Sequence, residues 1–105
     1  MSTHYSLIIT SYSRADTGSR ITAALLATKL AACVQVFPVR SAYRWKGKLV
    51  KDREHLMLIK ARTRRFRKVK ETILAHHDYA TPEIIALQID RADAAYARWM
   101  AKATR

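Results

Sequence analysis

The chain has 105 residues, half of them hydrophobic, and its 20 Lys and Arg against 8 Asp and Glu give a net charge of +12. This length leaves room for one hydrophobic core, and the apolar content excludes an intrinsically disordered chain. No apolar run approaches the roughly 20 residues of a transmembrane helix, and the first residues lack the pattern of a secretory signal. The single cysteine, Cys33, allows no internal disulfide, so we expect a cytoplasmic protein without membrane attachment.

The first strand and helix are indicated by composition and by periodicity. Residues 5–10, YSLIIT, are rich in Ile and Leu and predict a strand. Residues 13–32 predict a helix, because their apolar residues repeat at helical spacing. Ser13 with Asp16 resembles a capping box, so we expect the helix to begin there.

A long hairpin is predicted next. Residues 33–47 and 48–61 are β-branched and aromatic, and they follow each other with a turn expected near Lys46–Gly47–Lys48. Pro38 has no N–H to donate to a strand ladder, so it predicts an edge strand or a bend.

The last third of the chain predicts a helix, a strand and a final helix. Residues 63–77 form a helix that we expect Thr63 to cap, and residues 83–89 form the fourth strand. Residues 93–103 close the chain as a helix. The predicted apolar stripe of the 63–77 helix consists of Phe66, Val69, Ile73 and then His76 or His77.

This order, β-α-β-β-α-β with a C-terminal helix, predicts an α+β protein of the ferredoxin-like type, with helices on one face of an antiparallel sheet. Three segments are apolar at consecutive positions, namely 7–9, 56–59 and 84–87. Because consecutive strand residues point to opposite faces, both faces of the sheet centre are apolar. The two main helices cover one face only, so we expect a homo-oligomer that buries the other.

Four segments together resemble the CutA family of divalent-cation tolerance proteins, over about residues 5–100. They are KLAACVQVFPVRSAYRWKGKL (29–49), LIKA (58–61), HHDYATPEIIALQI (76–89) and YARWM (96–100). The resemblance implies one CutA-like domain over residues 1–105, assembled as a tight homotrimer similar to the PII signalling proteins. It also implies a non-catalytic role in binding copper and other divalent cations and in tolerance to them.

The sequence departs from the family pattern in four respects. Gln35 stands where Asn is usual after AACV, and Asp78 stands where Pro is expected between His and Tyr. The first strand ends in TSYS, at residues 10–13, without the cysteine that is common there. The strongly basic charge is also unusual. These differences concern metal affinity and the surface rather than the fold.

Histidine is the first candidate for a metal ligand. His77 matches the histidine that precedes the tyrosine in the family motif, and its neighbour His76 is a second candidate. Imidazole binds Cu(II), Zn(II) and Ni(II) well, although a histidine at a helix C-terminus also interacts with free carbonyl groups. Cys33 is either a soft ligand or a small buried hydrophobic residue. In one subunit Cys33 and His77 are expected roughly 20 Å apart, so a shared site would cross a subunit boundary.

The hairpin tip is expected at the same end of the sheet as His77. Tyr43, Trp45 and Tyr79 are therefore candidates for an inter-subunit cleft, either as interface packing or around a small ligand or partner of a PII-like regulator. Glu83 lies near them in the predicted topology, as a metal ligand or as the partner of a Lys or Arg in an ion pair.

Two other functional classes were weighed. The chain has no G-x-S-x-G or H-E-x-x-H motif, so we do not expect an enzyme. Neither inner strand has the aromatic pattern of an RNA-recognition module, so specific nucleic-acid binding is not expected. The basic segment 60–70 is either a solvated helix face or a polyanion-binding surface. The residues of that alternative are Arg64, Arg65, Arg67, Lys68 and Lys70.

Overall fold

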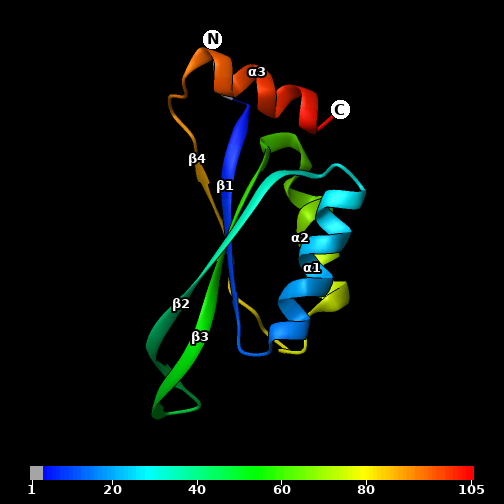
Figure 1. Ribbon diagram of the computed structural model, residues 1–105. Coiled ribbons are helices and arrows are strands. Elements are labelled where there is room, and N and C mark those ends of the chain that lie inside the picture. Colours follow the sequence, from blue (N-terminus) through cyan, green and yellow to red (C-terminus); the bar gives the residue numbers. More distant parts are fainter. Residues whose placement is uncertain (1–3) are drawn as a thin grey trace.

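A four-stranded antiparallel sheet organises the chain, and the computed structural model describes it over residues 4–105. The elements are β1 (Tyr5–Tyr12), α1 (Ala15–Ala27), β2 (Ala31–Trp45), β3 (Lys48–Arg62), the 3-10 turn η1 (Thr63–Arg65), α2 (Phe66–His76), β4 (Ile84–Gln88) and α3 (Ala94–Ala103). The strand order is β2-β3-β1-β4, α1 and α2 lie on one face of the sheet, and α3 lies across one end (Figure 1). The predicted ferredoxin-like order is confirmed.

The hydrophobic core lies between the sheet and the two long helices. Ile8 on β1 pairs with Ile59 on β3, and both side chains are fully buried. Ile21 from α1 and Ile73 from α2 belong to the same cluster of buried residues. Since alternate strand residues share a face, this cluster sets which residues face away from the helices.

Helix α1 starts and ends differently from the prediction. Its N-cap residue is Arg14 and has no side-chain capping bond, because the hydroxyl of Ser13 contacts the Tyr79 hydroxyl instead. The helix ends at Ala27 rather than at residue 32, because Lys29 adopts a left-handed φ of 58° and the N–H of Leu30 returns to the carbonyl of Leu25. This arrangement is a Schellman ending that uses Lys in place of the usual Gly.

The start of the second helix also differs. Thr63 begins the 3-10 turn η1, and α2 proper begins at Phe66 without a side-chain cap. The Thr63 hydroxyl lies 2.8 Å from that of Ser6 on β1, so a tertiary contact occupies the group that was expected to cap the helix.

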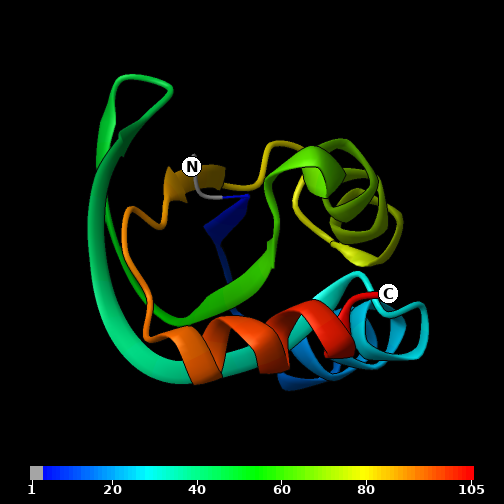
Figure 2. The ribbon, with the colours of Figure 1, turned by 90° about the horizontal axis from the view of Figure 1, so that it is seen from above.

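The β2–β3 hairpin is long and strongly curved. Each of its strands has 15 residues, and its turn at Lys46 and Gly47 has positive φ at both positions, which suits a tight hairpin. Seen from above, the hairpin bends around the face of the sheet that α1 and α2 leave free (Figure 2). Pro38 lies on β2, the edge strand, as predicted.

The second face of the sheet is apolar and open in one subunit. Ile85 and Leu87 on β4 are each 49% exposed, and they pair with Ile9 and Leu7 on β1. Helix α3 covers only one end of the sheet, where Arg62 donates hydrogen bonds to the carbonyls of Ala101 and Thr104. Among residues 4–105, no helix has the length and apolar character needed to cross a membrane.

Candidate functional site

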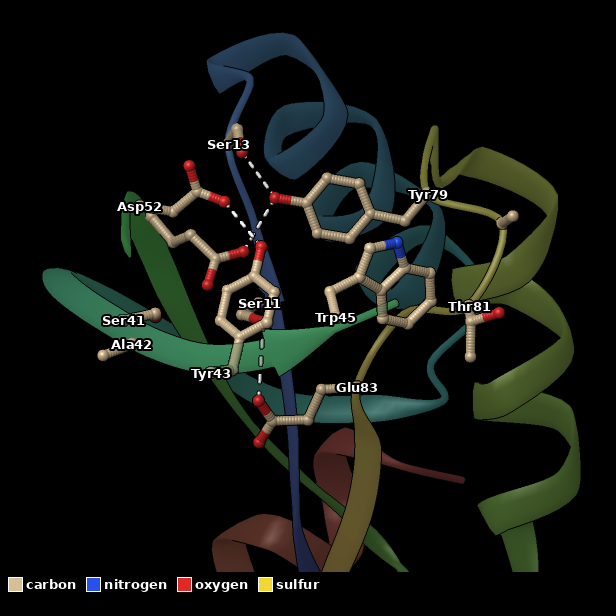
Figure 3. Close-up of a pocket in the computed structure, with 12 residues that line it drawn as sticks. Ser11, Ser13, Ser41, Ala42, Tyr43, Trp45, Asp52, Tyr79, Thr81 and Glu83 are labelled. Atoms are coloured by element: carbon tan, nitrogen blue, oxygen red, sulfur yellow. Dashed lines mark hydrogen bonds between the residues drawn. The ribbon is translucent and has the colours of Figure 1, made fainter. Parts of the chain in front are cut away.

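A cavity of about 650 Å³ lies where the hairpin tip meets the loop before β4 and the end of β1 (Figure 3). Its lining includes the aromatic residues Tyr43, Trp45 and Tyr79 and the carboxylates Asp52, Glu54 and Glu83. The predicted neighbours Tyr43, Trp45, Tyr79 and Glu83 are therefore brought together by the curved hairpin.

Each carboxylate in the cavity receives a hydrogen bond from a hydroxyl group. The Tyr43 hydroxyl donates to Asp52 across 2.6 Å, and the Tyr79 hydroxyl donates to Glu54 across 2.7 Å. A longer contact of 3.5 Å joins the Ser11 hydroxyl to Glu83. These bonds orient the carboxylates without neutralising them.

The cavity is acidic in a basic protein. Three of the chain's eight Asp and Glu residues line it, and no Lys or Arg does so. Glu54 is only 7% exposed. Asp16, outside the cavity, shows the contrast: Arg14 and Arg20 bind its carboxylate and hold its pKa well below the usual range. The cavity carboxylates have no such cation among residues 4–105.

The two tyrosines remain neutral hydrogen-bond donors over a wide pH range. The hydrogen bond to Asp52 is the largest cause that raises the pKa of Tyr43 to about 12. Burial is the largest cause that raises the pKa of Tyr79 to about 12, and the hydrogen bond to Glu54 adds to it. At neutral pH both phenols are therefore protonated beside ionised carboxylates.

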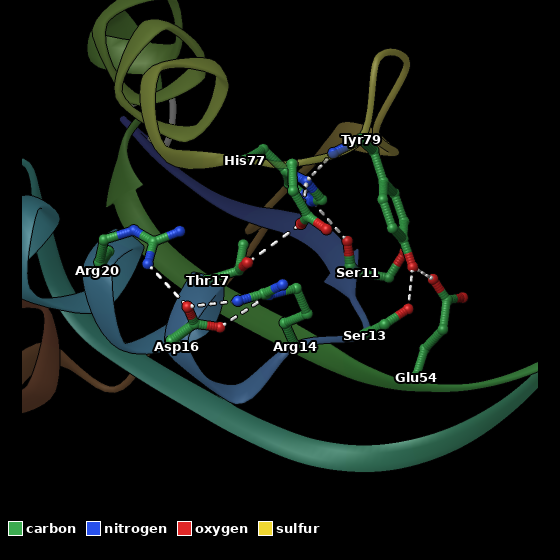
Figure 4. A network of polar contacts seen from close by, with 10 residues as sticks. Ser11, Ser13, Arg14, Asp16, Thr17, Arg20, Glu54, His77 and Tyr79 are labelled. Atoms are coloured by element: carbon green, nitrogen blue, oxygen red, sulfur yellow. Dashed lines mark hydrogen bonds and ion pairs between the residues drawn. The ribbon is translucent and has the colours of Figure 1, made fainter.

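His77 lies next to the cavity with a fully buried side chain (Figure 4). Its Nδ1 accepts a hydrogen bond from the backbone N–H of Tyr79 across 3.0 Å, so the proton resides on Nε2. Nε2 lies 2.8 Å from the carbonyl oxygen of Ser11 and donates to it. Both ring nitrogens are thus engaged, and a metal on either one would have to replace a hydrogen bond.

The other predicted ligands are separated from one another. His76 lines a groove between α1 and α2 together with Arg65 and Lys68. Cys33 pairs with Lys60 on β3, at the level of Leu7 on β1, whereas His77 contacts Ser11, four residues further along that strand and about 13 Å away.

The predicted set of His76, His77, Cys33 and Glu83 therefore does not form a common site within one subunit. Nor does any other group of three His, Cys, Asp or Glu side chains within residues 4–105 have the geometry of a metal site. Glu83 also lacks the ion pair that was its other predicted role, because its hydrogen-bond partner in the described chain is the Ser11 hydroxyl.

Asp52 and Glu54 were missed by the sequence analysis. The available signal was their spacing: two residues apart on β3, they lie on the same face as Leu56 and Leu58, which is the open face of the sheet. Ser41 pairs directly with Asp52, which places the hairpin tip over this acidic pair.

The basic residues of the polyanion alternative lie on η1 and α2, away from the cavity. Arg64, Arg67, Lys68 and Lys70 are exposed, and Arg65 is half-buried in the groove beside α1. Arg67 pairs with Glu71 of the next helical turn. This surface matches a solvated helix face, and polyanion binding by it stays a prediction.

Comparison with known proteins gives one consistent result. The CutA1 divalent ion tolerance protein family matches residues 6–103. The divalent-cation tolerance protein CutA of Thermus thermophilus is 44% identical over 85 residues, which are 80% of this chain and 82% of that protein. The corresponding protein of Archaeoglobus fulgidus is 38% identical over 81% of this chain and 83% of its own length.

Solved structures agree with the sequence comparison. The structure described as the periplasmic divalent cation tolerance protein CutA from Archaeoglobus fulgidus superposes with a TM-score of 0.93. It is 33% identical in sequence, and the match covers 96% of this chain and 99% of that one. This chain belongs to the CutA1 divalent ion tolerance protein family.

Proposed function

We propose that this protein is a non-catalytic, homotrimeric, cytoplasmic protein that binds divalent cations, copper first among them, and takes them at the cavity beneath the hairpin tip. The observation that carries the proposal is the acidic cavity itself. Asp52, Glu54 and Glu83 present three carboxylates without a Lys or Arg in the lining, in a chain of net charge +12. The names of the relatives support a role connected with divalent cations.

The carboxylates suit a cation bound at its periphery by oxygen atoms. Asp52 and Glu83 each have one oxygen that a hydroxyl does not occupy. Because three ligands do not converge within residues 4–105 of one subunit, water or a neighbouring subunit supplies the rest of the coordination shell in this proposal. Cu(II) comes first because a given set of oxygen and nitrogen ligands binds it more tightly than other divalent first-row metals.

The trimer in the proposal buries the open face of the sheet. That face presents Ile85, Leu87 and Phe37 to solvent in one subunit, each with more than two fifths of its surface exposed. An apolar face of this kind requires a partner surface, and a second copy of the same sheet supplies one of matching character.

Native mass spectrometry of the metal-free protein with added Cu(II) tests the proposal. We expect a trimer that takes up Cu(II), with uptake that falls at least about tenfold in affinity when Asp52→Asn and Glu83→Gln are combined. Glu71→Gln, on the exposed face of α2, removes a carboxylate elsewhere and serves as the matched control. A monomer, or a trimer whose uptake the double substitution leaves unchanged, would refute the proposed site.

A further inference from the structure

We propose that the cavity beneath the hairpin tip also binds a small organic cation, an aliphatic polyamine, between its carboxylates and its aromatic rings. This inference rests on the proposed function only in that it assigns a cationic ligand to the same cavity. It extends that function from metal ions to an organic ligand class.

The size of the cavity favours a molecule over a bare ion. Its volume of about 650 Å³ lies within the range of about 300–1,000 Å³ that is typical of small-molecule sites. A divalent metal requires several ligand atoms at about 2.0–2.6 Å, and no three His, Cys, Asp or Glu side chains within residues 4–105 are arranged in this way. The space between the carboxylates is therefore suited to a ligand with atoms of its own.

The charge in the cavity calls for a cation. Glu54 is 7% exposed, and only one of its oxygens, Oε2, accepts a hydrogen bond within the described chain, from Tyr79. A carboxylate buried beside two others without a counter-charge is costly unless a cation completes it. The hydroxyl groups of Tyr43 and Tyr79 hold one oxygen of Asp52 and of Glu54, which leaves the second oxygen of each for a ligand.

The aromatic rings supply the second element of recognition. The rings of Tyr43, Trp45 and Tyr79 gather around the cavity (Figure 3). Trp45 is 48% exposed, although a large apolar ring gains from burial. An ammonium group above such a ring gains a cation–π interaction, which is strongest for Trp, and methylene groups pack well against the same surface.

The placement of the carboxylates selects a ligand with more than one charge. Asp52 and Glu54 lie on β3, whereas Glu83 lies just before β4, with the Tyr43 ring between them in the close-up (Figure 3). A molecule with ammonium groups at both ends of a methylene chain reaches both sides and lays the chain along the rings. Non-specific attraction does not explain such binding, because the protein as a whole has a net charge of +12 and repels polycations.

Isothermal titration calorimetry with spermidine, and separately with Cu(II), tests the inference. We expect the wild-type protein to bind spermidine and not octane-1,8-diol, which has a similar chain and no charge. Trp45→Leu is expected to weaken spermidine binding about three- to thirtyfold and to leave Cu(II) binding unchanged, because only the organic cation uses the ring. Combining Asp52→Asn with Glu83→Gln is expected to weaken both, and the control Glu71→Gln neither.

The outcomes separate the two proposals. Spermidine binding without Cu(II) binding supports the organic ligand and overturns the metal function. Cu(II) binding without spermidine binding does the reverse. Spermidine binding that neither Trp45→Leu nor the double carboxylate substitution weakens would place the ligand elsewhere and overturn the inference. Circular dichroism of each variant confirms that the fold is retained, which the exposed position of Trp45 makes the expected result.

Discussion

The phenol of Tyr79 donates a hydrogen bond to Oε2 of Glu54 across 2.7 Å and joins the loop after α2 to β3. The same hydroxyl contacts that of Ser13, at the start of α1. One side chain therefore connects three segments that are far apart in the sequence. This connection fixes one wall of the acidic cavity and keeps the buried carboxylate of Glu54 oriented.

The raised pKa values of Tyr43 and Tyr79 predict a late phenol titration. With folded-state pKa values of about 12, these two tyrosines ionise above the other phenols as the absorbance at 295 nm is followed through rising pH. Tyr43→Phe and Tyr79→Phe are each expected to remove one late step. Titration of all five phenols together near pH 10 would contradict the hydrogen bonds described above.

The same shifts predict how stability depends on pH. An unfolded tyrosine ionises near pH 10, whereas the folded Tyr79 stays protonated to about pH 12, so the unfolded state binds fewer protons between these values. The contribution of Tyr79 is therefore complete below pH 10 and is lost as the pH rises from 10 to 12. In urea denaturation over this range, Tyr79→Phe should show a shallower fall in the free energy of unfolding than the wild type. An identical slope would refute the assignment.

His77 is predicted to be important for stability. His77→Ala leaves the N–H of Tyr79 and the carbonyl of Ser11 without their partner in a buried place, so we expect a loss of about 3 kcal/mol in the free energy of unfolding. His77→Gln, whose amide can still donate to Ser11, should recover part of that loss. His76→Ala, at a half-buried position, should cost less than about 1 kcal/mol. Urea denaturation measures all three, and equal losses for the two alanine variants would contradict this role.

Much of the fold could be predicted from local patterns, and the errors have local causes. The strand order follows from periodicity and from the Lys46–Gly47 turn. The end of α1 could not be predicted, because its left-handed residue is Lys29, and Lys gives no signal of a helix end as Gly does. The caps expected at Ser13 and Thr63 were wrong because each hydroxyl makes a tertiary contact that no local pattern records.

The candidate site was predictable in part for the same reason. The neighbours Tyr43, Trp45, Tyr79 and Glu83 follow from the topology, since the hairpin tip and the start of β4 share one end of the sheet. Asp52 and Glu54 depend on how far the hairpin curves over the open face (Figure 2), and curvature has no signature in the hydrophobic pattern. The engagement of both nitrogens of His77 likewise depends on a loop conformation.

Gly18 is predicted to be required for close packing of α1 on β1. A Cβ atom at this position would lie 2.2 Å from Cζ of the buried Tyr12 ring. Gly18→Ala is therefore expected to destabilise the protein by about 2–4 kcal/mol, because the ring is confined and stacks on His55.

A double substitution tests whether Tyr12 is the cause of that loss. In Tyr12→Leu with Gly18→Ala the smaller side chain leaves room for the new methyl group, so the combined loss should be at least about 1 kcal/mol less than the sum of the single losses. Thermal denaturation of the four proteins measures this coupling. Additive losses would show that the clash is not the reason.

Charge on the open face of the sheet is predicted to break the oligomer. Leu87→Glu places a carboxylate on the apolar face that the proposed trimer buries, so light scattering after size exclusion should show a monomer. Leu74→Glu, on α2 and similarly exposed, should leave the oligomer intact. A trimer that persists in Leu87→Glu and dissociates in Leu74→Glu would place the interface on the helical side.

The central claim, that the acidic cavity is the cation site, is tested most directly by an anomalous difference map from crystals soaked in Cu(II) and measured at the copper absorption edge. We predict a peak within about 3 Å of a carboxylate oxygen of Asp52, Glu54 or Glu83, and its loss in crystals that carry Asp52→Asn with Glu83→Gln. A sole peak at the imidazole of His76 or His77, or at the sulfur of Cys33, would contradict the claim and return the metal site to those residues.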